Sequence, residues 1–342
     1  MRRVLLAEPG QFRVEEVATP EPGPREVVVA VQRAGICGSD VHIYHGVSPV
    51  RPPLVLGHEF SGTVHSLGSA VSGWSIGDRL TAEPGIQCGA CTYCRSGRYN
   101  LCARQYTIGG WRGHDGAYAD FVRVPADKLV PLPKGMTFDV GAMVEPVACA
   151  MHAMEVGGVR AGEAVLVIGA GTIGQLIAQA ARLAGATRVA VADVLPGRLA
   201  LAARLGANAV ANPREEELVD WAVREFGEGG ISRVFDTAST PETFEKAVAI
   251  VRRGGRIVVV GVPTQPVRWL PLPLLYEIEL TGMNMYVRRN FDQALAAIVR
   301  GDIQVQPLVS VSYPLDDVEA AYRAVHDQAD SLVKVMLAPP LG

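Results

Sequence analysis

The chain has 342 residues, of which 49% are apolar and 20% charged, and its formal net charge is −3. This length favours two domains over one. The near-neutral charge, without a basic cluster, argues against nucleic acid and against a membrane surface as partners, and no stretch is apolar enough to span a bilayer.

The first third of the chain is predicted to be rich in β-strands. Short β-forming runs at 26–31, 61–67, 78–81 and 119–124 are separated by Gly and Pro. Such strands without intervening helices are typical of an irregular β-barrel or sandwich. The apolar run in residues 1–8 is far too short for a signal peptide, so we expect a cytoplasmic protein.

From about residue 148 the pattern changes to apolar strands alternating with helices. Strands are predicted at 165–168, 189–193, 233–236 and 256–260, and helices at 174–183, 198–205 and 241–251. This alternation predicts a doubly wound parallel α/β sheet. The last elements, helices at 291–299 and 315–325 and strands at 308–311 and 333–337, are expected to return to the first domain. That domain would comprise residues 1–148 and 287–342, around a second domain of residues 149–286.

Four of the six cysteines lie in one short segment, the lobe 84–106. These are Cys88, Cys91, Cys94 and Cys102. Four thiolates so close in sequence can bind one Zn²⁺ tetrahedrally with no open position, which is a structural site. Two disulfides would require a secreted chain, and the bacterial iron–sulfur pattern spaces its last cysteine more tightly and follows it with proline. We therefore expect structural zinc.

A second group of metal-ligand residues lies upstream of this lobe. Cys37 and His58 each stand beside a glycine, and they offer sulfur and nitrogen ligands that suit Zn²⁺. Either Glu59 or Glu145 is a candidate for a third, carboxylate ligand. Such a site keeps one position open, where the metal can polarise a substrate hydroxyl beside a hydride-accepting cofactor.

A dinucleotide-binding fingerprint follows in the second domain. The predicted strand at 165–168 runs into Gly169, Gly171 and Gly174, which permit a tight turn, close approach of a pyrophosphate and close helix packing. The next strand ends in Asp193, placed to bind a ribose diol and to repel a 2′-phosphate. We therefore expect NAD rather than NADP, although Arg198 nearby is a residue that can accommodate a phosphate.

Taken together, these motifs resemble the zinc-dependent medium-chain dehydrogenases over nearly the whole chain. The matching segments are 35–42, 57–62, 77–79, the four-cysteine lobe, Glu145-Pro146 and 169–174. The resemblance implies a GroES-like catalytic domain and an inserted Rossmann domain. It also implies one catalytic and one structural zinc per chain and an NAD-dependent oxidation of an alcohol.

The family resemblance also assigns roles to residues. Cys37 and His58 would bind the catalytic zinc, with Glu59 as third ligand in the resting enzyme and Glu145 outside the ligand set or exchanging with Glu59. Ser39 would relay a proton to His42 and solvent. The implied cofactor-binding residues are Gly169, Gly171, Thr172, Ile173, Gly174, Asp193, Arg198, Gly261, Val262, Met283, Asn284 and Met285.

Different segments of the sequence resemble different branches of the family. The segment 145–152 resembles sorbitol- and xylitol-type (polyol) dehydrogenases, and Tyr286 matches their pattern, so Glu145 and Tyr286 are expected at the substrate. Ile43 and Met285 depart from that pattern, and Arg288 is similar to threonine dehydrogenases. We expect polyol oxidation by a homotetramer. L-Threonine 3-dehydrogenase and 2,3-butanediol dehydrogenase remain alternatives, as, more remotely, does a non-catalytic dinucleotide-binding protein.

Overall fold

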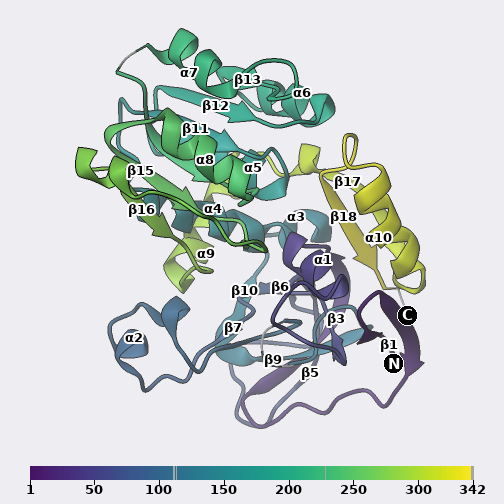
Figure 1. Ribbon diagram of the computed structural model, residues 1–342. Helices are drawn as coiled ribbons and strands as arrows, with labels where there is room; N and C mark the ends of the chain where they lie inside the picture. Colours follow the sequence, from purple (N-terminus) through teal and green to yellow (C-terminus); the bar gives the residue numbers. More distant parts are fainter. Residues whose placement is uncertain (111, 113, 228, 340–342) are drawn as a thin grey trace. The chain divides into compact units, whose positions relative to one another are not determined.

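The computed structural model describes residues 1–110, 112, 114–227 and 229–339 (Figure 1). The chain forms two compact units. The first consists of Met1–Glu145 together with the segment from Val305 onward, and the second of Pro146–Gln304. No helix in these described ranges is both long enough and apolar enough to cross a membrane.

The first unit is built mainly from short strands. A three-stranded sheet has the order β2-β1-β4, a larger sheet has the order β10-β6-β5-β3-β18-β17 with β9 paired to β3, and β7 pairs with β8. Their bounds are β1 (Arg2–Glu8), β2 (Gln11–Glu16), β3 (Glu26–Gly35), β4 (Leu54–Val55), β5 (Glu59–Leu67), β6 (Arg79–Ala82), β7 (Gly85–Ile86), β8 (Tyr106–Thr107), β9 (Phe121–Pro125), β10 (Leu129–Pro131), β17 (Val309–Pro314) and β18 (Lys334–Ala338).

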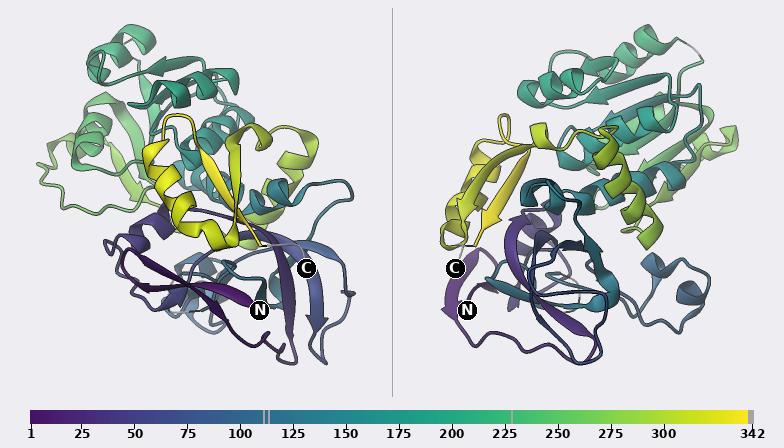
Figure 2. Two further views of the ribbon diagram at one scale, coloured as in Figure 1. Left: turned by 90° about the vertical axis from the view of Figure 1, so that its right-hand side faces the viewer. Right: turned by 180° about the vertical axis from the view of Figure 1, so that it is seen from behind.

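Helices in this unit are few and short. They are α1 (Gly38–Tyr44), α2 (Thr92–Arg95), α3 (Phe138–Ala142) and α10 (Val318–Asp327), and α4 (Val144–Gly157) begins here and continues into the second unit. The chain end returns to this unit, because β18 pairs antiparallel with β3, Met336 opposite Gly35 (yellow and purple in Figure 2). Strand β18 thereby adds its side chains to the region where β3 ends.

The second unit is a six-stranded sheet with helices packed on it. Its order is β13-β12-β11-β14-β15-β16, and every neighbouring pair is parallel. The strands are β11 (Ala164–Ile168), β12 (Arg188–Ala192), β13 (Ala209–Ala211), β14 (Ile231–Asp236), β15 (Val251–Val259) and β16 (Glu279–Gly282), and the helices α5 (Thr172–Leu183), α6 (Pro196–Arg204), α7 (Leu218–Phe226), α8 (Pro241–Ile250) and α9 (Arg288–Arg300). The predicted doubly wound α/β class is confirmed.

Apolar burial explains why these strands read as continuous hydrophobic runs. Leu166 of β11, Trp221 of α7 and Ala247 of α8 belong to one buried cluster between sheet and helices. A parallel sheet covered by helices excludes water from its strands, which favours Val, Ile and Ala at every position. Strands β13 and β16 were not predicted, because three or four residues are too few to show a period. Helix α7 was also not predicted, although Leu218, Trp221 and Ala222 are buried at helical spacing.

The second unit extends beyond the expected boundary at residue 286. Helix α9 belongs to it, and Arg289 of α9 pairs with Glu155 of α4 at 2.8 Å between Nη2 and Oε2. The side-chain amide of Gln179 in α5 also donates to the backbone carbonyl of Gln304 and accepts from its N–H. These contacts keep the chain with the parallel sheet up to Gln304.

Candidate active site and metal sites

The metal-ligand candidates of the first unit are brought together by the pairing of β3 with β5. These strands are antiparallel, and Gly35 lies opposite Glu59. Cys37 follows Gly35 by two residues, and His58 precedes Glu59 by one, so both stand at the same end of the strand pair. Side chains that are about twenty residues apart in sequence thus become neighbours through backbone pairing.

The three side chains form a compact donor group. One ligand atom each from Cys37, His58 and Glu59 lies within 4.8 Å of the other two. Glu59 is buried, and Cys37 and His58 are half-buried. A thiolate, an imidazole and a carboxylate at this spacing fit a zinc ion with three protein ligands. Among the described residues, neither Glu145 nor Cys149 belongs to this group, although Glu145 is also buried.

A buried carboxylate, Asp40, stands behind His58. Its side chain is fully buried, and Oδ1 lies 3.4 Å from His58 Nδ1. Oδ2 accepts from the Cys37 backbone N–H at 3.0 Å and from the Tyr118 hydroxyl at 3.1 Å. Oδ1 has no hydrogen-bond partner among the described residues. With Nδ1 turned to Asp40, His58 presents Nε2 to a metal, and the proton is directed to Nδ1.

Negative charge dominates this pocket. Burial would lower the pKa of His58, but the carboxylate of Asp40 and the Cys37 thiolate raise it well above its usual value. The pocket therefore stabilises positive charge on the half-buried imidazole of His58. The same surroundings stabilise a divalent cation, so the donor chemistry and the charge both fit zinc.

Lys334 is a cation within the same group, and sequence analysis did not identify it. Its Nζ lies 2.5 Å from Glu59 Oε2 and 3.0 Å from the Ile36 carbonyl oxygen. Burial would lower the pKa of Lys334, but Glu59, Cys37 and Glu145 raise it above the usual value. The lysine comes from β18, 275 residues beyond Glu59, and no local motif marks it.

The predicted proton-relay residues lie on helix α1. Ser39 and His42 are both half-buried, and Nδ1 of His42 is buried without a hydrogen-bond partner among the described residues. Burial, and after it the nearby His45, lower the pKa of His42. The imidazole is thus neutral at neutral pH and can accept a proton.

The four-cysteine lobe brings its sulfur atoms together as predicted from their spacing. Ligand atoms of Cys88, Cys91, Cys94 and Cys102 all lie within 4.8 Å of one another. Sγ of Cys94 is 3.4 Å from that of Cys91 and 3.8 Å from that of Cys88. A tetrahedron with Zn–S bonds of about 2.3 Å has sulfur–sulfur edges of about 3.8 Å, so the lobe fits a closed zinc site.

Backbone donors contribute to this lobe. The N–H groups of Ala90 and Cys91 lower the pKa of the Cys88 thiol to about 6. A thiol with that pKa is ionised at neutral pH, which is the state that binds zinc. The loop therefore prepares one thiolate before any metal arrives.

The glycine turn of the second unit has the geometry of a phosphate-binding turn. Gly169 has φ +98°, and a Cβ on Gly174 would lie 1.8 Å from the Gly169 carbonyl oxygen. Gly171 is the N-cap of the twelve-residue helix α5, which begins with Thr172 and Ile173. The Thr237 hydroxyl, missed by sequence analysis, donates to the carbonyls of Ile168 and Gly169 and fixes the turn. The amino end of a helix such as α5 offers backbone N–H groups and the positive end of the helix dipole to an anion.

Asp193 stands at the end of β12 as expected, but its carboxylate also has backbone partners. Oδ2 accepts from Ala170 N–H at 2.6 Å, and Oδ1 accepts from Leu195 N–H at 2.9 Å. Asp193 thus ties the glycine turn to the next strand. Arg198 lies near the same turn, since a Cβ on Gly171 would be 3.7 Å from its Nη1.

The remaining cofactor candidates follow the carboxyl ends of neighbouring parallel strands. Gly261 and Val262 follow β15, and Met283, Asn284 and Met285 follow β16, whose Gly282 pairs with Val259. All of these residues therefore lie at the sheet edge that carries the glycine turn, where dinucleotides bind to open parallel sheets.

Tyr286 lies inside the second unit. It is 1% exposed, and its ring packs on Phe291 with centroids 5.8 Å apart. The tyrosine therefore contributes to the packing of α9 through Phe291. Its expected role at the substrate is a proposal taken up below.

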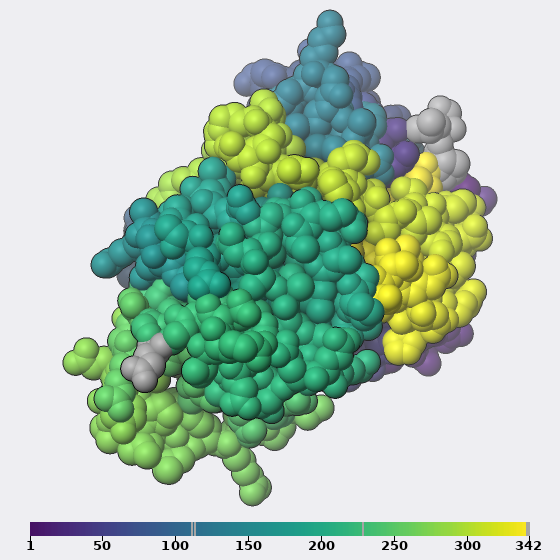
Figure 3. All heavy atoms as spheres, turned by 90° about the horizontal axis from the view of Figure 1, so that it is seen from above, coloured from purple at the N-terminus to yellow at the C-terminus, as the bar shows by residue number. Residues whose placement is uncertain are grey.

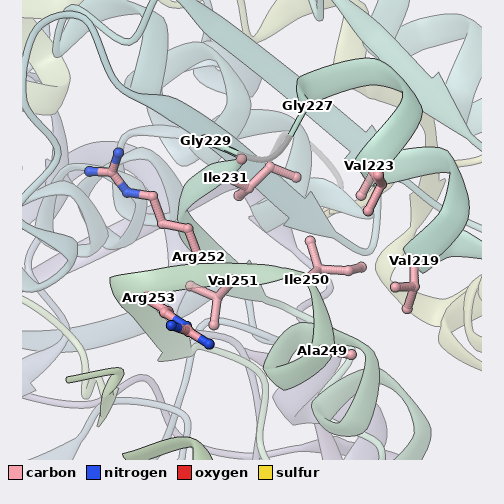
Figure 4. A pocket seen from close by; sticks show the side chains of 12 residues that line it. Val219, Val223, Gly227, Gly229, Ile231, Ala249, Ile250, Val251, Arg252 and Arg253 are labelled. Carbon is pink, nitrogen blue, oxygen red and sulfur yellow. The ribbon is translucent and has the colours of Figure 1, made fainter. Parts of the chain in front are cut away.

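A hollow in the second unit lies away from these residues (Figure 4). It measures about 540 Å³ and is lined by apolar side chains such as Val223 and Ile250 and by Arg252 and Arg253. It borders Ile231 and Val251, the first residues of β14 and β15. This is the amino end of the strands, opposite the glycine turn, and the lining contains none of the predicted site residues.

Comparison with known families agrees with this geometry. Residues 23–134 match the family model of the alcohol dehydrogenase GroES-like domain, and residues 172–300 match that of the zinc-binding dehydrogenases. The chain belongs to the zinc-dependent medium-chain dehydrogenases. The resemblance inferred from the motifs is thus confirmed, and the enzyme is an NAD-dependent alcohol dehydrogenase that uses zinc. A non-catalytic binding protein is set aside.

Relatives of this dehydrogenase are named for several different substrates. Sorbitol dehydrogenase of Bacillus subtilis is 29% identical over 345 residues, covering 99% of this chain and 97% of the relative. L-Threonine 3-dehydrogenase of Chelativorans sp. is 34% identical and covers 95% of each chain. The solved structure of galactitol-1-phosphate dehydrogenase from Escherichia coli matches with a TM-score of 0.90 at 29% identity, covering 99% of this chain and 100% of that one.

Proposed function

We propose that this dehydrogenase oxidises a secondary hydroxyl of a sugar alcohol or similar vicinal diol to a ketone. The observation that carries the proposal is the donor group itself, in which a carboxylate from Glu59 joins Cys37 and His58. A carboxylate in place of a second cysteine resembles the polyol branch. Similarity to a sorbitol dehydrogenase and to a galactitol-1-phosphate dehydrogenase supports the same substrate class.

We propose the following roles for individual residues. Cys37, His58 and Glu59 hold the catalytic zinc, and the four cysteines of the lobe hold the structural zinc. When bound, zinc polarises the reacting hydroxyl, and NAD accepts the hydride. Ser39 takes the hydroxyl proton and passes it towards His42, whose lowered pKa keeps it neutral and able to accept. Glu145 and Tyr286 contact the neighbouring hydroxyls of the substrate.

A threonine substrate is less well supported by the charges near Tyr286. Recognition of threonine requires a cation for its carboxylate, and Arg288 is the candidate from the sequence. In the structure Nε of Arg288 already pairs with Asp292 at 2.8 Å within α9. Arg289 likewise pairs with Glu155. Both guanidinium groups therefore have carboxylate partners inside the second unit, which favours an uncharged polyol.

The test is a substrate panel read by NADH formation. Sorbitol, xylitol, galactitol, galactitol 1-phosphate, L-threonine and 2,3-butanediol are compared before and after removal of zinc by a chelator. We expect chelator-sensitive oxidation of polyols with threonine inert. Preference for threonine or butanediol would overturn the proposed substrate class.

Two variants separate the chemistry from the fold. Cys37→Ser replaces a zinc ligand and should abolish turnover while the chain still binds NADH, because the glycine turn belongs to the other unit. Cys149→Ser is the matched control, since Cys149 lies outside the donor group among the described residues. Tyr286→Phe should raise the KM for polyols with little change in NADH binding if its hydroxyl contacts substrate.

We infer that the enzyme is a homotetramer in the cytoplasm. Strand β16 ends the parallel sheet, and the segment 262–276 precedes it (light green in Figure 3). This segment exposes apolar side chains, among them Leu270 at 72% and Leu275 at 77%. Exposed apolar surface of this extent suits a subunit contact. Six free cysteines, five of them proposed as zinc ligands, suit a reducing compartment. Sedimentation at varied protein concentration would test the tetramer.

A further inference from the structure

The ion pair between Lys334 and Glu59 is unusual because one partner is a candidate metal ligand. The lysine and glutamate side chains are 1% and 2% exposed. A buried charge must be compensated locally, since the enclosed ammonium and carboxylate have both lost their water. Lys334 Nζ also donates to the Ile36 carbonyl oxygen, one residue before Cys37. The Lys334 ammonium is therefore held beside the ligand group by two acceptors, the Glu59 carboxylate and the Ile36 carbonyl.

The absence of a side chain at Gly35 makes room for the Glu59 carboxylate beside Lys334. A Cβ built on Gly35 would lie 2.3 Å from Glu59 Oε2, so the carboxylate fills the space that a side chain would need at Gly35. Oε2 therefore lies close to Gly35 and is bound by Lys334. One carboxylate oxygen is engaged by the lysine, which leaves the other for the metal.

We propose that Lys334 is an internal counter-ion of the catalytic metal site, which stabilises Glu59 in the metal-free enzyme and weakens its bond to zinc in the loaded enzyme. The proposal rests on the assignment of Cys37, His58 and Glu59 as zinc ligands. Lys334 is a positioning residue, because it acts on the metal through Glu59.

The physical consequence is a competition between two cations for one carboxylate. Without zinc, Lys334 neutralises Glu59, so the empty pocket carries less uncompensated charge and the fold tolerates it. With zinc present, the lysine withdraws charge from Glu59 and repels the metal, which lowers zinc affinity. A ligand held in this way exchanges more readily than a free carboxylate.

The experiment compares Lys334→Met with a second buried lysine. Lys128 pairs with Glu83 at 3.4 Å, with both side chains about as buried, and neither residue belongs to the catalytic donor group among the described residues. Lys128→Met is therefore the matched control for the loss of a buried lysine. Zinc release to a chromophoric chelator and thermal unfolding, with and without catalytic zinc, are measured for each variant.

In Lys334→Met we expect release of catalytic zinc to slow by about tenfold, because the charge that competes with zinc for Glu59 is removed. The melting temperature should fall more in the metal-free than in the loaded form. Lys128→Met should leave catalytic zinc release unchanged. Equal losses of melting temperature in both forms, with unchanged or faster release of zinc from Lys334→Met, would show a merely structural lysine and overturn the proposal.

A second variant covers the case in which Lys334→Met does not fold. Lys334→Gln keeps a donor for Glu59 and the Ile36 carbonyl but removes the charge, so zinc release should still slow by several-fold. Unchanged or faster release in Lys334→Gln would also overturn the proposal. A wild-type enzyme that binds only one zinc per chain would instead refute the ligand assignment under the proposed function.

Discussion

Replacement of Asp40 by asparagine tests whether this buried carboxylate sets the proton on His58. The two side chains have the same shape, so the packing of Asp40, which is fully buried, is preserved. Oδ2 receives two donors, the Cys37 N–H and the Tyr118 hydroxyl. The oxygen of an asparagine must therefore take that position, and its NH₂ group must face His58 Nδ1.

This reversal changes the tautomer of the imidazole. An NH₂ group 3.4 Å from Nδ1, the present Oδ1 distance, requires Nδ1 to accept, which moves the proton to Nε2. A protonated Nε2 cannot bind zinc. Loss of such a partner of a metal-binding histidine weakens metal affinity by about 10- to 100-fold, or about 1.4–2.8 kcal/mol.

Zinc content after dialysis against graded concentrations of a chelator measures the effect. Wild type should retain two zinc ions per chain at concentrations where Asp40→Asn retains only that of the four-cysteine lobe. Tyr118→Phe is the comparison, because it removes one hydrogen bond to Asp40 without reversing the tautomer and should shift the curve less. If Asp40→Asn kept both ions with wild-type affinity, the assignment of His58 as a ligand through Nε2 would be refuted.

Three further changes test the lobe, the cofactor turn and the relay. Cys94→Ser should lose one zinc per chain and lower the melting temperature while NADH still binds; retention of both ions would contradict the lobe assignment. Gly174→Ala, whose Cβ would lie 1.8 Å from the Gly169 carbonyl, should weaken NADH binding at least about tenfold in a fluorescence titration, whereas Gly229→Ala has open space and should not. His42→Gln should slow oxidation by about tenfold or more. In the wild-type pH–rate profile the rate should fall only below pH 6.5, because burial lowers the pKa of His42 and only its neutral form accepts a proton, and His42→Gln should remove this fall. A wild-type rate that already falls above pH 6.5 would contradict this role.

The four-cysteine metal site and the cofactor turn are each determined by a short segment of sequence. The four lobe cysteines lie within fifteen residues, so any compact loop brings their sulfur atoms together, and the ligand set is readable without the fold. The same holds for Gly169, Gly171 and Gly174, which act within one strand–turn–helix unit. Each conformation requires little more than local backbone geometry, and local geometry depends on neighbouring residues.

Sequence alone could not show the partners that surround the catalytic donor group. Cys37 and His58 meet only because β3 and β5 pair with Gly35 opposite Glu59. Tyr118 reaches Asp40 from 78 residues away, and Lys334 reaches Glu59 from 275 residues away. Compensation of a buried charge depends on which groups surround it in space, and strand order decides this. The sequence by itself therefore determined which residue types can bind the metal. The tertiary structure decided which charged groups surround those ligands and shift their protonation and metal affinity.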